Sequence, residues 1–234
     1  MNPAPPTSVI VPTFREVEAL PDLIDRISKV RTENGSISEL LIVDDDSRDG
    51  TEALIGARPE PWVKLIVRKE DRGLSQAVLA GLHAARGDLF VVMDADLSHP
   101  PEAIADMQRE IQGGADFVVG SRYISGGSTS DDWGLLRFIN SWVATTLARP
   151  LTTITDPMSG FFALPRHVFE RAREPSPLGY KIGLELLVRC ACTNVREVPI
   201  HFVNRVRGES KLTLKQQLLY VRHLSRLYRF KLGV

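Results

Sequence analysis

One stretch constrains the fold most: residues 89–101, where a short apolar run passes directly into two aspartates. Residues 89–93 are all apolar, and a run of this length predicts a buried strand of a parallel sheet. Pro101 then suits the first turn of a helix. Asp94 and Asp96 are therefore expected at the carboxyl end of a central strand, where open α/β sheets bind their ligands.

This pair of carboxylates is a candidate cation site. Residues two apart on a strand point the same way, so Asp94 and Asp96 could share one ion if the strand geometry continues that far. Carboxylate oxygens suit Mg²⁺ or Mn²⁺, and magnesium sites combine one or two carboxylates with substrate phosphates. The alternative is a solvated aspartate turn, which is common after strands.

Apolar runs alternate with helical periods through the first 122 residues, which predicts the α/β class with a mostly parallel sheet flanked by helices. Strands are expected at 8–12, 39–44, 63–67, 89–93 and 117–122. Helices are expected at 18–31, from about 49–51, at 73–85 and at 102–112.

Three of these strands are followed by acid, and parallel strands place their carboxyl ends at one edge of the sheet. Glu16, then Asp44 with Asp45, then the 94/96 pair are therefore expected to converge on one crevice. The chain contains neither a G-x-G-x-x-G after the first strand nor a G-x-x-x-x-G-K-[ST] motif, which argues against a dinucleotide site and a P-loop. An acidic crevice of this kind suggests that a metal ion handles phosphates.

The pattern is less regular after residue 125. A helix at 133–147, a strand or buried edge at 161–164, a helix from about 178–187 and a strand at 195–203 are expected.

The tail, 205–234, holds eight Lys or Arg residues and a single acid, Glu209. A helical stripe is expected on its apolar positions Leu214, Leu218, Val221, Leu224 and Tyr228. This pattern predicts a basic amphipathic helix on a membrane surface. The alternative is a helix docked on the domain with a solvated basic face.

Composition sets outer bounds on the class. With 234 residues, 43% hydrophobic and 25% charged, the chain fits a soluble globular protein of one α/β domain or two small ones. The net charge of zero gives no sign of nucleic-acid binding. No 18-residue apolar run and no signal peptide are present, so we expect a cytoplasmic protein with peripheral membrane contact only. Cys190 and Cys192 are expected to be reduced thiols.

Six motifs in order give the sequence a specific resemblance. They are VPTFRE at 11–16, VDDDSRDGT at 43–51, MDADLSHP at 93–100, GSRY at 120–123, DPMSGFF at 156–162 and RVRGESKL at 205–212. Over about residues 8–225 the chain resembles family 2, GT-A-fold glycosyltransferases, and within them polyprenol- and dolichol-phosphate mannose synthases.

The resemblance implies one GT-A, Rossmann-like catalytic domain at 1–204, with a nucleotide-sugar half at about 8–122 and an acceptor half at about 123–204. It implies that 205–234 form a basic closing loop and a C-terminal amphipathic membrane-surface helix. The implied reaction is inverting, metal-dependent transfer of mannose from GDP-mannose to a polyprenyl (dolichyl) phosphate on the cytoplasmic face of a membrane. Mg²⁺ or Mn²⁺ is the implied cofactor, and a small membrane partner subunit is possible.

The resemblance also carries roles onto single positions. Asp94, Asp96 and Arg122 are the implied catalytic residues. Donor contacts are implied for Pro12, Phe14, Glu16, Val43, Asp45, Asp94, Ala95, Asp96, Lys181, Arg205 and Lys211. The acceptor phosphate is assigned to Arg122, Arg137 and Ser141. The metal ion is assigned to Asp94, Asp96 and Ser98, where some relatives have glutamine in place of Ser98.

A general base is not required by this chemistry, because a phosphate monoester is largely a dianion at pH 7. His99 could serve as a base or metal ligand, or it could support the neighbouring aspartates. Other activities stay open: a glucosyl or other glycosyltransferase that uses a UDP-sugar, or a non-catalytic membrane-surface subunit. A nucleotidyltransferase shares the α/β plan, but it would usually carry a glycine-rich phosphate loop.

Overall fold

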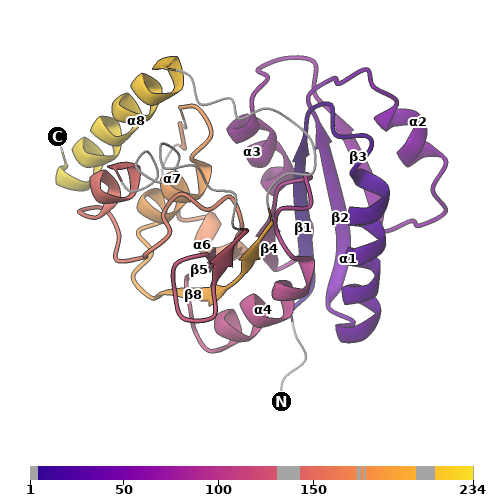
Figure 1. Cartoon of the computed structure of the whole chain (residues 1–234), viewed down its shortest axis with the longest axis horizontal. Coiled ribbons are helices and arrows are strands. Elements are labelled where there is room, and N and C mark those ends of the chain that lie inside the picture. Colours follow the sequence, from indigo (N-terminus) through magenta and orange to yellow (C-terminus); the bar gives the residue numbers. More distant parts are fainter. Residues whose placement is uncertain (1–4, 131–142, 173–174, 177, 204–213, 234) are drawn as a thin grey trace.

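The computed structural model describes residues 5–130, 143–172, 175–176, 178–203 and 214–233. Its centre is a seven-stranded sheet with strand order β3-β2-β1-β4-β7-β5-β8 (Figure 1). The strands are β1 (Thr7–Thr13), β2 (Ile37–Asp44), β3 (Val63–Val67), β4 (Leu89–Val92), β5 (Phe117–Ser121), β7 (Phe162–Pro165) and β8 (Val195–Pro199). All pairings except those of β7 are parallel, which confirms the predicted mostly parallel α/β sheet.

Helices cover both faces of the sheet. They are α1 (Leu20–Asn34), α2 (Thr51–Gly56), α3 (Leu74–Ala84), the 3₁₀ turn η1 (Pro101–Ala103) with α4 (Ile104–Gln112), α6 (Arg166–Phe169), α7 (Ile182–Arg189) and α8 (Leu214–Leu232). Alternate residues of β1 feed two separate cores: Val9 and Val11 pack with α1 and α4, whereas Ile10 packs with α3. This alternation is the period-two rule of a strand buried on both faces.

The predicted small-residue helix packs closely on the sheet. A Cβ at Gly81 in α3 would collide with the Ile10 side chain, so only glycine permits this approach of helix to strand. The close packing fixes the position of α3, whose first turn begins beside the carboxyl ends of the strands.

Strand β7 brings the loop that precedes it to the centre of the sheet. It lies between β4 and β5 and is antiparallel to both. Its amino end therefore lies at the edge where β4 and β5 have their carboxyl ends. As a result, the preceding loop, residues 156–161, arrives at the same edge as Asp94 and Arg122.

The strand expected at 195–203 is interrupted, because β8 ends at Pro199 and a second element follows. β9 (His201–Phe202) leaves the main sheet and pairs with β6 (Ser128–Thr129) in a two-stranded ribbon. Ser128 and His201 are also joined by a hydrogen bond of 2.6 Å between the hydroxyl and Nδ1.

The C-terminal helix α8 corrects the predicted tail. It lies against α7 at the opposite end of the molecule from β3 (Figure 1). A single apolar stripe through Leu218, Val221 and Leu224 is wrong: Leu224 is 4% exposed, whereas the other two are 72% and 54% exposed. The buried face instead consists of Tyr220, His223, Leu224 and Leu227. The helix is thus docked on the domain, and it also presents a separate outward apolar face.

Within the described residues, no helix is both long and apolar enough to cross a membrane. Most of the helix expected at 133–147 lies outside the described residues, as does the predicted closing loop from 205 to 212.

Candidate active site

The predicted convergence of strand ends is confirmed, because β2, β1 and β4 are adjacent and parallel. The loops after β1 and β2 are tied together by Asp44. Its carboxylate accepts hydrogen bonds from the Thr13 hydroxyl, at 3.0 Å, and from the Ser47 backbone N–H, at 2.8 Å. The Ser47 hydroxyl in turn accepts a hydrogen bond from the Arg15 N–H. These contacts hold the two loops in one conformation, with Arg15 in the left-handed region at φ 63°.

Asp45, an expected donor contact, is 5% exposed and bound on both oxygens. It pairs with Arg68 at 2.5 Å and accepts the Gly73 N–H at 2.6 Å, which joins β2 to the start of α3. Two other expected donor contacts, Pro12 and Val43, are buried and paired with each other in the β1–β2 register. Their side chains therefore face the core, and only their backbone borders the strand ends.

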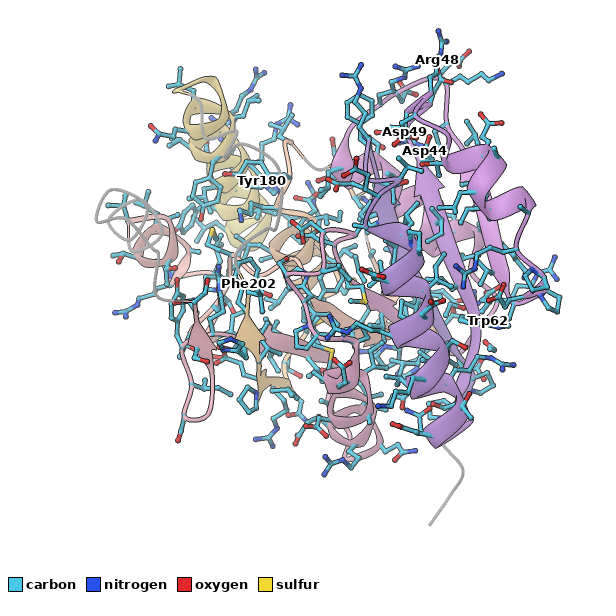
Figure 2. The ribbon with its side chains drawn as sticks, turned by 45° about the vertical axis from the view of Figure 1, so that its right-hand side comes forward. Asp44, Arg48, Asp49, Trp62, Tyr180 and Phe202 are labelled. Carbon is cyan, nitrogen blue, oxygen red and sulfur yellow. The ribbon has the colours of Figure 1, made fainter. Side chains whose placement is uncertain are left out.

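A pocket of about 560 Å³ opens above the ends of β1 and β2. It is lined by Phe14, Arg15, Asp46, Ser47, Arg48, Asp49 and Arg72. Asp46 holds Arg48 and Arg72 by ion pairs, and its pKa is lowered, with the Arg48 hydrogen bond as the largest cause. Figure 2 labels Arg48, Asp49 and Asp44 around this end of the molecule. The pocket combines an exposed aromatic ring with several cationic groups.

Asp94 follows β4 and is fixed by His99. The Asp94 N–H donates to His99 Nδ1 at 3.1 Å, so this nitrogen is an acceptor and is unprotonated. His99 is 2% exposed and stacks on Phe161, and burial lowers its pKa even though Asp94 and Asp96 oppose this. The geometry therefore favours the supporting role for His99 over that of a base.

Asp96 is oriented from within its own turn. Its Oδ1 accepts hydrogen bonds from the Ser98 N–H and from the Ser98 hydroxyl, and Leu97 between them has φ 62°. Ser98 is 1% exposed, so it acts on Asp96 from the buried side of the turn. Ala95 is likewise buried.

This turn suits a hard divalent cation, because the Asp94 side chain is 28% exposed and carries oxygen donors. Among the described residues, no group of three or more His, Cys, Asp or Glu side chains is arranged to hold a metal ion. Protein carboxylates and the phosphates of a substrate would therefore have to share the coordination, as is usual for Mg²⁺.

Arg122, placed just after β5, is held by a carboxylate that has no exposed surface. Its Nε and Nη2 each donate to Asp156 at 2.7 Å, and the Arg122 N–H also donates to the same side chain. Burial alone would lower the pKa of Arg122, but Asp156 more than reverses this and raises it. The backbone of Asp156 is fixed by Glu197 from β8. The guanidinium is therefore permanently charged and set in one orientation.

Lys181 approaches the same group from the N-terminus of α7. Its Nζ donates to the Met158 carbonyl at 2.9 Å and lies 4.6 Å from the Tyr180 ring centroid. Burial, and then the Arg122 charge, lower the pKa of Lys181 to about 8, while Asp156 and Asp94 oppose this. Cations and carboxylates thus meet within one electrostatic cluster.

Gly160 allows the loop to pass close to Asp94. A Cβ at this position would lie 3.2 Å and 3.3 Å from the two Asp94 carboxylate oxygens. A larger residue would push that carboxylate out of place, and this gives the glycine of the DPMSG motif a physical role.

The remaining assignments are distributed as follows. Glu16 lies in the β1–α1 loop, where its carbonyl accepts the Ala19 N–H, and Phe14 is 42% exposed at the pocket. Arg137, Ser141, Arg205 and Lys211 lie outside the described residues. Sequence reasoning missed the part played by Asp156 and Gly160, although their motif carried the resemblance. Their signal was an Asp-Pro turn directly before a buried strand.

The family model described as "Glycosyl transferase family 2" matches residues 8–173. The chain belongs to glycosyl transferase family 2. It is 44% identical to a dolichol-phosphate mannosyltransferase of Mycosarcoma maydis over 98% of this chain and 81% of that protein. It is 39% identical to the protein of the same name from Saccharomyces cerevisiae, over 97% of this chain and 88% of the relative. The chain is thus a family 2 glycosyltransferase.

A third relative, from Pyrococcus furiosus, has the same name and is 42% identical over 96% of this chain, which spans 64% of that longer protein. Among solved structures, this family 2 enzyme is similar to mannosyl-3-phosphoglycerate synthase from Rubrobacter xylanophilus, with a TM-score of 0.76 and 20% identity over 97% of this chain and 75% of that one. It also resembles glucosyl-3-phosphoglycerate synthase from Mycobacterium tuberculosis in complex with Mn²⁺ and UDP, with a TM-score of 0.70 and 20% identity over 98% and 79% of the chains. The fold is therefore GT-A-like.

Proposed function

We propose that this family 2 glycosyltransferase moves mannose from GDP-mannose to a polyprenyl (dolichyl) phosphate, with inversion and with a divalent cation. The observation that carries the proposal is the meeting of Asp94 and Asp96 with Arg122 and Lys181 at one edge of the sheet. A reaction between a nucleoside diphosphate sugar and an anionic acceptor needs carboxylates that can hold a metal ion and cationic side chains that can bind phosphate. Both kinds of group must lie at one place. The names of the relatives supply the sugar and the acceptor class.

The donor would lie along the ends of β2, β1 and β4. Strands are about 4.8 Å apart, so the ends of β2 and β4 lie about 10 Å from each other, and a nucleoside diphosphate can extend from the pocket above β1 and β2 toward Asp94. Phe14 offers that pocket an aromatic face, and the guanidinium carbon of Arg15 lies 5.2 Å from the centroid of the Phe14 ring. The diphosphate would then reach the 94–96 turn.

The metal proposal rests on the oxygen donors of that turn and on the Mn²⁺ recorded in the structural relative. When bound there, Mg²⁺ or Mn²⁺ supplies positive charge that stabilises the departing diphosphate. Asp94 and Asp96 would hold it, and Ser98 would keep Asp96 in orientation. The protein's own cations complement this, because fixed donors stabilise developing charge without reorganisation.

The acceptor phosphate carries its own negative charge to the sugar. Arg122 is charged and fixed by Asp156, so it can orient a phosphate oxygen for in-line attack. No protein base is needed, because the acceptor is largely a dianion at pH 7. His99 has its Nδ1 occupied, which agrees with this view.

The acceptor is a lipid, so we also propose that the protein works at the cytoplasmic face of a membrane as a peripheral protein. The outward face of α8 supports this: Leu218, Val221 and Leu232 are exposed there. Helix α8 has no acidic residue, and Arg222 and Arg229 are exposed beside those side chains. A small membrane partner subunit could bind the same face.

The test is a donor panel with a short-chain polyprenyl phosphate as acceptor. GDP-mannose, GDP-glucose, UDP-glucose and UDP-N-acetylglucosamine would be offered separately at equal concentration with Mg²⁺ or Mn²⁺. We expect product from GDP-mannose at a rate at least about tenfold above any other donor, which corresponds to about 1.4 kcal/mol of discrimination. Preferential use of UDP-glucose would keep the glycosyltransferase and reject the proposed donor.

A further inference from the structure

The contact between α8 and α7 has a polar centre within an otherwise apolar interface. His223 of α8 and Glu185 of α7 are joined at 2.6 Å between Nε2 and Oε2, and both side chains are 1% exposed. Around them pack Tyr220, Leu224 and Leu227. A buried polar pair in an apolar contact favours one alignment of the two helices, because any other alignment would leave Oε2 of Glu185 without its partner.

Glu185 uses its other oxygen to hold the chain that leads to the active site. Its Oε1 accepts the Ser176 N–H at 2.9 Å and Arg189 Nε at 3.1 Å. Its backbone N–H donates to the Lys181 carbonyl. The Glu185 side chain therefore holds Ser176, and its backbone N–H holds Lys181 at the start of α7.

Burial alone would raise the pKa of Glu185, but the hydrogen bonds from His223 and Ser176 outweigh burial and lower it. The carboxylate is thus ionised and fully engaged away from the crevice. Such a group has no access to substrate, so its role is to position other groups. Arg189 adds to the same contact, because its guanidinium lies 4.5 Å from the Phe230 ring centroid on α8.

We propose that His223 and Glu185 are positioning residues, which transmit the docking of the C-terminal helix to Lys181 in the active site. In this arrangement α8 has two faces with two tasks. The outward face is exposed and apolar, and the inward face clamps α7 through His223. Loss of the clamp releases Ser176 and the start of α7 at Lys181, while the catalytic aspartates stay in place.

The histidine bond is directional. Nε2 faces Glu185, and Nδ1 is buried without a hydrogen-bond partner. Only the Nε2 bond is therefore needed, and glutamine can supply an N–H donor near this place. His223→Gln should preserve the clamp, whereas His223→Ala should remove it.

The experiment compares His223→Ala, His223→Gln, and Leu227→Ala as a matched control. Leu227 is fully buried in the same interface, so its truncation loosens apolar packing and leaves the His223–Glu185 bond intact. Ser225→Ala, on the exposed side of α8, serves as a surface control. Each variant is measured by thermal unfolding, by amide hydrogen exchange over residues 178–189, and by the extent of Lys181 acylation in mass spectrometry.

We expect His223→Ala to raise the rate of amide hydrogen exchange in residues 178–182 about tenfold, and the extent of Lys181 acylation by a similar factor. This is the size of effect expected when a hydrogen bond to a charged group is lost. His223→Gln should stay within about threefold of the unmodified protein. In sugar transfer, His223→Ala should raise KM more than it lowers kcat, because a binding cation is misplaced. If Leu227→Ala, at an equal loss of Tm, reproduced these changes, or if His223→Ala left them unchanged, the positioning role would be wrong.

The role of Lys181 as a substrate contact rests on the proposed function, but exchange and acylation need no substrate. Failure of sugar transfer in the unmodified protein, together with the expected exchange pattern, would therefore reject the function and keep the coupling of α8 to Lys181.

Discussion

The β1–β2 side and the β5–α7 side of the molecule use their carboxylates differently. On the side of β1 and β2, Asp45 and Asp46 pair with arginines, but Asp44 and Asp49 accept hydrogen bonds from backbone N–H groups and hydroxyls of nearby loops. On the side of β5 and α7, Asp156 and Glu185 are paired with the cationic or basic side chains of Arg122 and His223. Asp44 and Asp49 shape loops, whereas Asp156 and Glu185 hold side chains in position.

This difference predicts how each side responds to mutation. A carboxylate that accepts a few local hydrogen bonds can be removed at modest cost, since water or a shifted loop replaces it. A carboxylate that balances a buried cation cannot, because its loss leaves an uncompensated charge. The β5–α7 side, where Asp156 balances the buried Arg122, should therefore be more fragile in stability and in activity than the loop contacts of Asp44 and Asp49.

The largest effect is expected for Asp156→Ala. Arg122 is 9% exposed and Asp156 is fully buried, so the variant should lose about 3–5 kcal/mol of unfolding free energy. Urea denaturation measures this. The double variant Arg122→Met with Asp156→Leu sharpens the comparison: it should recover most of the stability, because the pair is replaced by apolar groups, and yet remain inactive. An activity retained by the double variant would show that Arg122 is not needed for the chemistry.

Asp96→Asn tests the turn that lies between the two sides. We expect sugar transfer to fall by about 10²–10³-fold, the loss typical when a major stabiliser of transition-state charge is removed. The asparagine still accepts the Ser98 hydrogen bonds, so Tm should change little. Asp106→Asn on the exposed face of α4 is the matched control, and it should keep full activity. Equal turnover in the two variants would contradict the assignment of Asp96 to the metal.

Asp49→Ala tests the β1–β2 side. Asp49 accepts hydrogen bonds from the Val17 N–H at 3.1 Å and from the Thr51 N–H and hydroxyl. Its removal should cost about 1–2 kcal/mol, below the cost of Asp156→Ala. Urea denaturation of the two variants under one set of conditions decides the point. An equal or greater loss for Asp49→Ala would break the distinction between the two sides.

The last prediction concerns pH. The pKa of Lys181 is about 8 in the folded protein, below its ordinary value of about 10.4 in the unfolded chain. Between these values the unfolded chain binds more protons, so the contribution of Lys181 to stability rises with pH from about 8 to about 10. Denaturation of the metal-free protein and of Lys181→Met across this range should differ in slope, with the rise absent from the variant. Parallel curves would mean that Lys181 is not desolvated.

The strands and the acidic edge followed from local rules. Expected strands of five or six residues and the α/β alternation were enough to place Asp94 and Asp96 beside the end of β1. The fold class could be predicted because the apolar residues of each strand and helix recur at the spacing that is characteristic of that element.

The fragile side could not be predicted in this way. Asp156 and Arg122 are 34 residues apart, and they meet because β7 inserts antiparallel between β4 and β5. The spacing of apolar residues does not predict this strand order. The docked face of α8 depends on the surface that α7 offers, so His223 and Leu227 are buried while Leu218 is exposed. Val43 likewise shows that a position in a motif does not tell which way its side chain points.

One measurement tests the central claim most directly: transfer of labelled mannose from GDP-mannose to a short polyprenyl phosphate, with Mg²⁺ or Mn²⁺ and with excess chelator. We predict polyprenyl-phosphate mannose with the metal and none with the chelator, and restored product when metal is added back. Product formation that survives the chelator would contradict the metal site at Asp94 and Asp96. The absence of any product, in a preparation that transfers another sugar, would contradict the proposed substrate pair.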